Sequence, residues 1–253
     1  MAFRSLSTAA TGMAAQQLNI DVIANNIANV TTTGFKRSRP EFSDLLYQEY
    51  RRVGTQSSDT GTIVPAGVQV GLGVKPVATY RINEQGSLVA TNNQLDVAIK
   101  GRGFLEVTLP DGTTAYTRDG ALKLSNTGQI VTADGYNVQP NITVPANATA
   151  ISINAVGQVQ ATIPGQVNQQ LLGQIQLANF INEAGLQANG DNLLSETEAS
   201  GPPTVGNPGD VGFGQLQQFF LEQSNVNMVS EMTDLITAQR AYEINSKVIQ
   251  RSE

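Results

Sequence analysis

The sequence predicts an α+β protein in which two long terminal helices pair as a coiled-coil-like base, with an antiparallel β domain inserted between them. Two observations carry this prediction. Apolar residues recur every seven positions near both ends, and the middle consists of short alternating runs separated by turn dipeptides. Residues seven apart share one face of an α-helix, so each end presents a single apolar stripe that needs a partner surface.

The N-terminal stripe predicts a helix from about residue 3 to residue 28. After it, a run of β-branched residues and Gly34 favour an end to the helix. At 1.5 Å per residue the helix is roughly 40 Å long, which suits a rod better than the surface of a small domain. The stripe contains Leu6, Met13, Ile20, Ile23 and Ile27.

The C-terminal stripe predicts a second helix, which starts between residues 215 and 230. Ser224, Asn225 and Asn227 are its candidate N-caps, because their side-chain oxygens can accept hydrogen bonds from the first free N–H groups. The stripe contains Met228, Met232, Leu235, Tyr242 and Ile249.

Between the helices the pattern changes to strands and turns. Residues 41–50 have an apolar side that favours a short helix, and residues 68–74 alternate like a strand. Asp-Gly pairs at 111–112, 119–120 and 134–135 then predict hairpins with type I′ turns.

These patterns divide the chain into a helical domain, a connector, a β domain and a Pro- and Gly-rich linker. The ranges are 1–45 with 215–253 for the helical domain, 46–75 for an extended, hairpin-like connector, 76–200 for the β domain and 201–214 for the linker.

Composition excludes several classes of function. Only 14% of residues are charged and the net charge is −6, which argues against nucleic-acid binding. The chain has no Cys and no His, so disulfides, the usual zinc sites and Cys- or His-based triads are excluded, and no cofactor is expected. No apolar run approaches the roughly 20 residues of a membrane span, so membrane insertion is not expected.

Residues 24–37, Ala-Asn-Asn-Ile-Ala-Asn-Val-Thr-Thr-Thr-Gly-Phe-Lys-Arg, resemble the N-terminal signature of the bacterial flagellar rod and hook axial proteins. Residues 224–227 and 239–247 resemble the closing helix of that family, and residues 101–104 and 116–120 resemble its β domain. Within the family, an extra stretch at 47–70 is most similar to the distal-rod members. A proximal-rod or hook paralogue is the alternative within the family.

The resemblance implies a structural subunit with no catalytic activity. Such a subunit assembles into a rigid tubular polymer that transmits torque from motor to hook and forms part of the export channel. Implied partners are further copies of the chain, proximal rod and hook proteins, surrounding ring proteins and the flagellar export apparatus. The implied location is the periplasm-spanning rod of the basal body, reached without a cleaved signal peptide; the segment 1–6 lacks the apolar block of one.

We expect the two stripes and the Asn-rich end of the first helix to form the assembly interface, and both termini to fold only on assembly. The expected interface residues are Leu6, Met13, Ile20, Ile23, Asn25, Asn26, Ile27, Asn29, Met228, Met232, Leu235, Tyr242 and Ile249. The stretch expected to stiffen the rod is represented by Tyr47, Gln56, Ser57, Pro65 and Val70.

Two other classes remain open from the residues alone. A cell-wall hydrolase needs two acids beside a scissile bond, and the Asp-Gly acids fit turns better. A β-rich carbohydrate-binding module usually has an aromatic platform, and this chain has no Trp.

Overall fold

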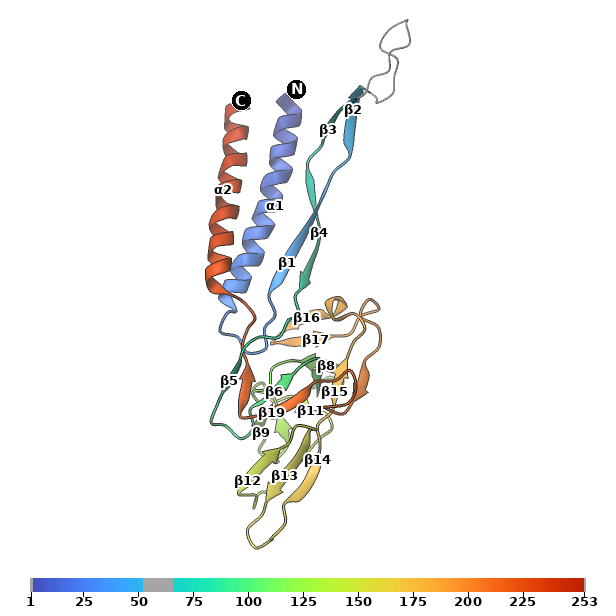
Figure 1. Ribbon diagram of the computed structural model, residues 1–253, viewed down its shortest axis with the longest axis vertical. Coiled ribbons are helices and arrows are strands. Elements are labelled where there is room, and N and C mark those ends of the chain that lie inside the picture. Colours follow the sequence, from blue (N-terminus) through green and yellow to red (C-terminus); the bar gives the residue numbers. More distant parts are fainter. Residues whose placement is uncertain (1, 52–65, 253) are drawn as a thin grey trace, which may run out of the picture. The chain divides into compact units, whose positions relative to one another are not determined.

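The computed structural model describes residues 2–51 and 66–252. Their contacts group into two compact units, which are described separately. The helical unit draws on residues 1–28, 38–80 and 227–253, and the β unit on residues 29–37 and 81–226. Figure 1 labels the elements of both.

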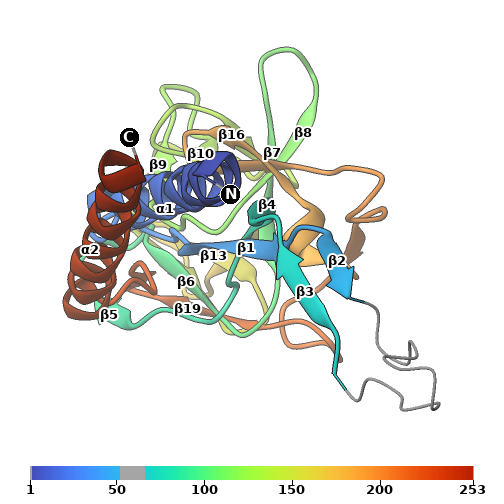
Figure 2. The ribbon, with the colours of Figure 1, turned by 90° about the horizontal axis from the view of Figure 1, so that it is seen from above.

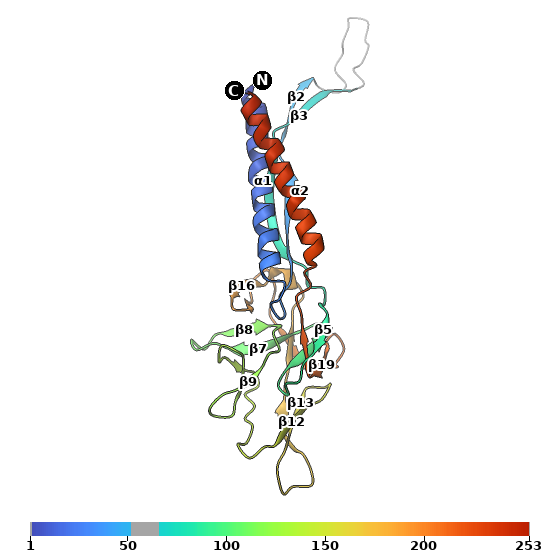
Figure 3. The same ribbon diagram turned by 90° about the vertical axis from the view of Figure 1, so that its left-hand side faces the viewer.

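Two antiparallel helices dominate the helical unit, α1 (Ala2–Ala28) and α2 (Met228–Ser252). They pack side by side with both chain ends at the same end of the pair (Figure 3). The predicted first helix is confirmed. Of the three candidate caps, Asn227 is the one that caps α2, because its Oδ1 accepts hydrogen bonds from the N–H groups of Val229 at 3.1 Å and Ser230 at 3.3 Å.

The rest of the helical unit is two strand pairs, seen beside α1 in Figure 2. Strand β1 (Ser38–Asp44) pairs with β4 (Val74–Arg81), and β2 (Tyr47–Arg51) pairs with β3 (Val68–Gly71). The short helix predicted for residues 41–50 is therefore wrong. Phe42 and Leu46 are exposed, so a helix here has no apolar face to bury, whereas strands gain hydrogen bonds along their length.

The β unit is built from short strands, and their pairings are antiparallel. The largest sheet has the order β16-β17-β8-β7-β11-β10-β9, with β15 joining β7 to β18, and the smaller groups are β12-β13-β14, β6-β19 and β5-β20. The strands are β5 (Leu88–Ala90), β6 (Val97–Lys100), β7 (Phe104–Thr108), β8 (Thr114–Thr117), β9 (Lys123–Leu124), β10 (Ile130–Val131), β11 (Asn137–Val138), β12 (Ala150–Ile153), β13 (Gln158–Thr162), β14 (Gln170–Gln174), β15 (Leu177–Asn179), β16 (Gln187–Gly190), β17 (Leu193–Ser195), β18 (Thr204–Gly206), β19 (Gln215–Gln218) and β20 (Phe220–Glu222), with a 3₁₀ turn at Glu183–Gly185.

Two of the three Asp-Gly pairs make the predicted hairpins, β7–β8 and β10–β11, but their turns are not type I′. Only the glycine of each pair has positive φ, +82° at Gly112 and +89° at Gly135. Each glycine N–H bonds the carbonyl three residues earlier, which fits a type I turn followed by a left-handed glycine. The third pair makes no hairpin. A Cβ on Gly120 would lie 1.6 Å from the Val97 carbonyl oxygen, so a close backbone approach requires glycine there.

Large apolar side chains fill the β unit. The main core includes Leu105, Val159 and Leu177, each fully buried. In a second cluster, Phe180 meets Phe104 and Tyr116 edge-on, with ring centroids 6.1 and 4.8 Å apart. Burial raises the pKa of Tyr116 to about 12.

Helix α2 begins within the predicted range of 215–230, but residues 201–222, assigned to the linker and to the start of the helical domain, contain three strands. Strand β18 pairs with β15, and β19 and β20 pair with β6 and β5. The chain therefore remains in the β unit through residue 226, later than the predicted boundary at 215. Short runs such as Gln215–Gln218 carry too weak a pattern to be recognised as strands without their partners.

Candidate assembly surface

The contact between α1 and α2 follows a seam of small and polar residues. Asn26 Nδ2 donates a hydrogen bond to Glu231 Oε2 at 3.1 Å, and a Cβ on Gly12 would lie 3.0 Å from Asn245 Nδ2. Both pairs lie two heptads apart along each helix, so they share one face in a single antiparallel register. Buried Ala238 lies midway between Glu231 and Asn245 on α2. The apolar pattern did not reveal these residues, although the same seven-residue spacing among small and polar residues would have found them.

Asn26 fixes the end of α1 to the start of β1. Its side chain is buried, with Nδ2 donating to the Ser38 carbonyl at 2.9 Å and Oδ1 accepting from the Ser38 N–H at 2.8 Å. Together with the bond to Glu231, the amide satisfies donors and acceptors from three elements of the helical unit.

The predicted interface residues therefore divide into groups. Ile23 and Asn26 are buried within a single copy of the chain. The remaining stripe residues of α1, with Leu235 and Ile249, are half-buried, as is Asn29 in the β unit, while Asn25 is exposed. Met228, Met232 and Tyr242 are also exposed. The C-terminal stripe is thus split between the seam and the solvent side of α2.

A second apolar row on α2 faces away from α1. Val229, Met232 and Ile236 are 76%, 51% and 49% exposed. At 100° per residue these three residues share one side of the helix, turned away from the seam residues Glu231 and Ala238. We call Val229, Met232 and Ile236 the outer ridge. The helical unit therefore leaves an apolar helix face uncovered.

Part of the predicted stiffening stretch is also apolar and exposed. Tyr47 is 56% exposed and Val70 is 43% exposed, on the paired strands β2 and β3. Gln56, Ser57 and Pro65 lie outside the described residues. A glycine at position 73 allows the hairpin to approach α1, since a Cβ there would lie 2.2 Å from Thr11 Oγ1.

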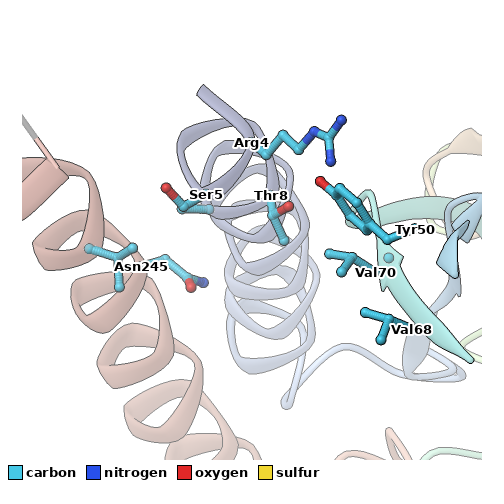
Figure 4. A pocket seen from close by; sticks show the side chains of 10 residues that line it. Arg4, Ser5, Thr8, Tyr50, Val68, Val70 and Asn245 are labelled. Atoms are coloured by element: carbon cyan, nitrogen blue, oxygen red, sulfur yellow. The ribbon is translucent and has the colours of Figure 1, made fainter. Parts of the chain in front are cut away.

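A groove of about 770 Å³ lies between this hairpin and the two helices (Figure 4). Its walls are mostly apolar and contain Arg4, Ser5, Thr8, Ala9, Tyr50, Val68, Val70, Gly71, Asn245 and Val248. The Arg4 guanidinium lies 5.1 Å from the centroid of the Tyr50 ring, a cation–π contact. Arg4 Nη1 is buried and finds no hydrogen-bond acceptor among the described residues.

In the β unit, the motif residues meet in a buried cluster of charges. Glu222 Oε1 accepts a hydrogen bond from Lys36 Nζ at 2.5 Å, and Oε2 accepts one from Arg118 Nε at 2.8 Å. Arg118 also donates to the Gly103 carbonyl at 2.9 Å, and Lys36 donates to the Glu84 carbonyl at 2.7 Å. Lys36 and Arg118 come from two of the recognised motifs, but no sequence signal marked Glu222 as their partner.

Burial works against the charges of Lys36 and Glu222, and the hydrogen bond between these two side chains opposes that effect for both. Burial lowers the pKa of Lys36, which its hydrogen bond to Glu222 opposes. Burial also disfavours the charged form of Glu222, yet Arg118 and Lys36 hold the pKa of that carboxyl below its ordinary value. The carboxylate is therefore ionised at neutral pH. It joins the segments that contain Lys36, Arg118 and Glu222.

Asn225 is a second polar junction in the β unit. Its Oδ1 accepts a hydrogen bond from the Arg37 N–H at 2.8 Å, and its Nδ2 donates to the Ile82 carbonyl at 2.8 Å. The Asn-rich motifs of this chain thus supply internal cross-links between segments distant in sequence.

The described residues include no cluster of three or more Asp or Glu side chains suited to a metal ion. Among the helices of the described part of the chain, none is long and apolar enough to cross a membrane.

Comparison with known proteins defines the class. The protein-family model described as "Flagella basal body rod protein" matches residues 6–36. A second family model, "Flagellar hook protein FlgE/F/G D1 domain", matches residues 98–161, and a third, "Flagellar basal body rod FlgEFG protein C-terminal", matches residues 217–253. These matches cover both helices and much of the β unit. The chain has the architecture of a flagellar rod or hook protein.

Relatives that match along nearly their whole length identify the family within this class. The chain is 59% identical to the flagellar basal-body rod protein FlgG of Caulobacter vibrioides, over 99% of this chain and 95% of the relative. It is 54% identical to FlgG of Agrobacterium fabrum, over 97% and 94%, and 39% identical to FlgG of Bacillus subtilis, over 99% and 95%. The chain belongs to the FlgG family of flagellar basal-body rod proteins.

Membership confirms the resemblance and the functional class. The chain is a structural subunit of the distal rod, located in the flagellar basal body, where it assembles with other flagellar components. The family is structural, so the hydrolase alternative is wrong.

Proposed function

We propose that this chain polymerises with copies of itself into a rigid tube, which transmits torque and encloses part of the export channel. The observation that carries the proposal is the uncovered apolar surface of the helical unit, on the outer ridge and on β2 and β3. Contiguous exposed apolar residues mark interaction sites. In a rod subunit, two different faces that fit each other give a head-to-tail contact that can propagate.

The proposed neighbours at the ends and sides of this tube are proximal rod and hook axial proteins, ring proteins and the export apparatus. The remaining expected interface residues, among them Leu6, Met13, Met228 and Met232, are proposed to lie between copies. Electron microscopy of the purified chain at rising concentration tests polymerisation. We expect straight tubes, and a chain that stays monomeric at every concentration would contradict the proposal.

We further propose that the stretch 47–70 stiffens the tube by wedging between neighbouring copies. The support is its exposed Tyr47, Tyr50 and Val70, which can pack against a second chain. The hydrogen bond from the Leu72 N–H to the Leu46 carbonyl, 3.1 Å, shows where a shortened hairpin can close.

The matching experiment replaces residues 47–71 with an Asn-Gly dipeptide, which favours a two-residue hairpin turn. We expect polymers that bend under conditions where the unaltered ones remain straight, measured as persistence length in electron micrographs. A matched control shortens the exposed turn around Val167 in the β unit and should leave the polymers straight. Straight polymers from the 47–71 variant would refute the wedge.

A further inference from the structure

The groove of the helical unit has the features of a binding site. It is largely apolar, it opens beside exposed Tyr50, Val68 and Val70, and its wall contains the Arg4 Nη1 group, which finds no acceptor among the described residues. A buried guanidinium N–H without an acceptor is costly, so an occupant that supplies a carboxylate beside apolar side chains satisfies both features.

The outer ridge of α2 has that chemistry. Val229, Met232 and Ile236 form its apolar part, and Glu243 lies seven residues beyond Ile236 on the same side of the helix. Arg240 and Lys247 flank this position, and Glu243 is the carboxylate of this face within the described part of α2.

The spacing of the two surfaces agrees in one orientation. Copies repeated along a tube keep one direction, so a neighbour's α2 runs antiparallel to α1, as it does within one chain. If Ile236 enters the groove level with Ala9, Glu243 lies roughly 10 Å further toward the start of α1. Arg4 lies roughly 7.5 Å along α1 in that direction, and helical side chains lean toward the N-terminus, which brings its guanidinium level with Glu243.

We propose that the groove of each copy receives the outer ridge of α2 from a second copy, with Ile236 among the groove's apolar residues and Glu243 accepting a hydrogen bond from Arg4. This contact rests on the proposed polymerisation and names the two surfaces that make it. One surface is concave and the other convex, so the contact is head-to-tail and leaves both surfaces available at the ends of a growing polymer.

Disulfide trapping tests the contact, because the chain has no natural Cys. Val70→Cys and Ile236→Cys are made as two separate single variants, so a bond within one chain is impossible. The two variants are co-polymerised and mildly oxidised. We expect disulfide-linked dimers in the mixture and not in either variant alone, because linkage requires the two Cβ atoms to approach to about 4 Å. Asp234→Cys, exposed on α2 but turned away from the ridge, is the matched control and should not link to Val70→Cys.

Charge reversal supplies a second measurement. Arg4→Glu and Glu243→Arg should each raise the critical concentration for polymerisation about tenfold, equal to 1.4 kcal/mol. The double variant should bring the critical concentration most of the way back to that of the unaltered chain. If the unaltered chain does not polymerise, the proposed function fails. If it polymerises but Val70→Cys fails to link to Ile236→Cys, or the double variant does not recover, the proposed contact is wrong and polymerisation stands. If another protein fills the groove, the chain still polymerises but the cross-link and the recovery are absent, so the proposed contact is wrong.

Discussion

The β unit and the helical unit bury different kinds of side chain. The β unit packs Leu105, Val159 and Leu177 completely, whereas the seam between α1 and α2 contains Gly12, Asn26, Ala238 and Glu231. Meanwhile large apolar residues of the helical unit, such as Val229 and Ile236, remain exposed. Apolar burial is the main favourable term in folding, so we expect the β unit to hold its fold alone and the helical unit to gain its full burial from neighbouring copies.

Hydrogen exchange on the monomer should show the largest contrast between the units. We expect amides of α1 and α2 to exchange nearly as fast as in an unfolded chain, because their apolar faces lack partners. Amides of β7 and β15, in the core of the β unit, should be protected. Polymerisation should then protect both helices. If the amides of both helices were protected from exchange in the monomer, the helical unit would fold alone as the β unit does, and the expected difference between the units would be wrong.

Glu222→Gln should weaken the β unit strongly. Removing the carboxylate leaves Lys36 and Arg118 buried without a counter-charge, and breaking a buried ion pair costs about 3–5 kcal/mol. Denaturant unfolding of the monomer measures this loss. The control is Glu183→Gln, which removes the pair with Arg102, whose side chain is 62% exposed, and should cost about 1 kcal/mol or less. Equal losses of unfolding free energy in the two variants would show that the buried charge cluster stabilises the β unit no more than the Arg102–Glu183 pair.

The same variant should alter the pH dependence of stability. The pKa of Glu222 is lower in the folded protein than in the unfolded chain, so its contribution is present above about pH 4.3, the ordinary value, and is lost as the pH falls through the folded value. Unfolding of the unaltered chain should therefore become easier below that pH. Glu222→Gln should show less of this acid dependence, and identical profiles would contradict the assignment.

Asn26→Ala should weaken the helical unit by a smaller amount. It removes three hydrogen bonds and leaves Ser38 and Glu231 groups without this partner, at about 1–3 kcal/mol. Because the unit is expected to be ordered only in the polymer, the measurement is the denaturant concentration at which polymers dissolve. Gln17→Ala, which loses one exposed hydrogen bond to Asp21, is the control and should have little effect.

Gly12→Ala should have the smallest effect. The new Cβ meets the end of the Asn245 side chain at 3.0 Å, which that side chain can relieve by moving. Alanine also favours a helix by about 1 kcal/mol over glycine, so the two effects should nearly cancel in the polymer dissolution assay. A large loss would show that the seam tolerates no increase in the distance between the helices.

The sequence predicted the parts of this fold that depend on local pattern. The seven-residue repeat from Leu6 to Ile27 identified α1, and Asp-Gly at 111–112 and 134–135 located two hairpins. It misled at residues 41–50, where the side chains look helical but the strand partners, residues 74–81 and 68–71, are distant in the chain.

The polar contacts were the least predictable feature. Glu222 meets Lys36 and Arg118 across 186 and 104 residues, and nothing in their local sequence encodes that meeting. The seam was missed for a different reason. Its spacing is regular, but Gly12, Asn26, Glu231 and Asn245 carry no hydrophobic signal, so a search for apolar stripes passes over them.

The hydrogen bonds of Asn26 have a consequence for a shaft under load. An apolar helix interface has no directional bonds across it, so side-chain packing alone holds its register. The Asn26 side chain bonds the N–H and the carbonyl of Ser38 and the carboxylate of Glu231 on the opposite helix, each at about 3 Å. Sliding the two helices by one residue moves them by about 1.5 Å, which stretches the 3.1 Å bond to Glu231 toward the limit of a hydrogen bond. We therefore expect axial sliding to strain these hydrogen bonds, and a subunit strained within its elastic range to return to the same register.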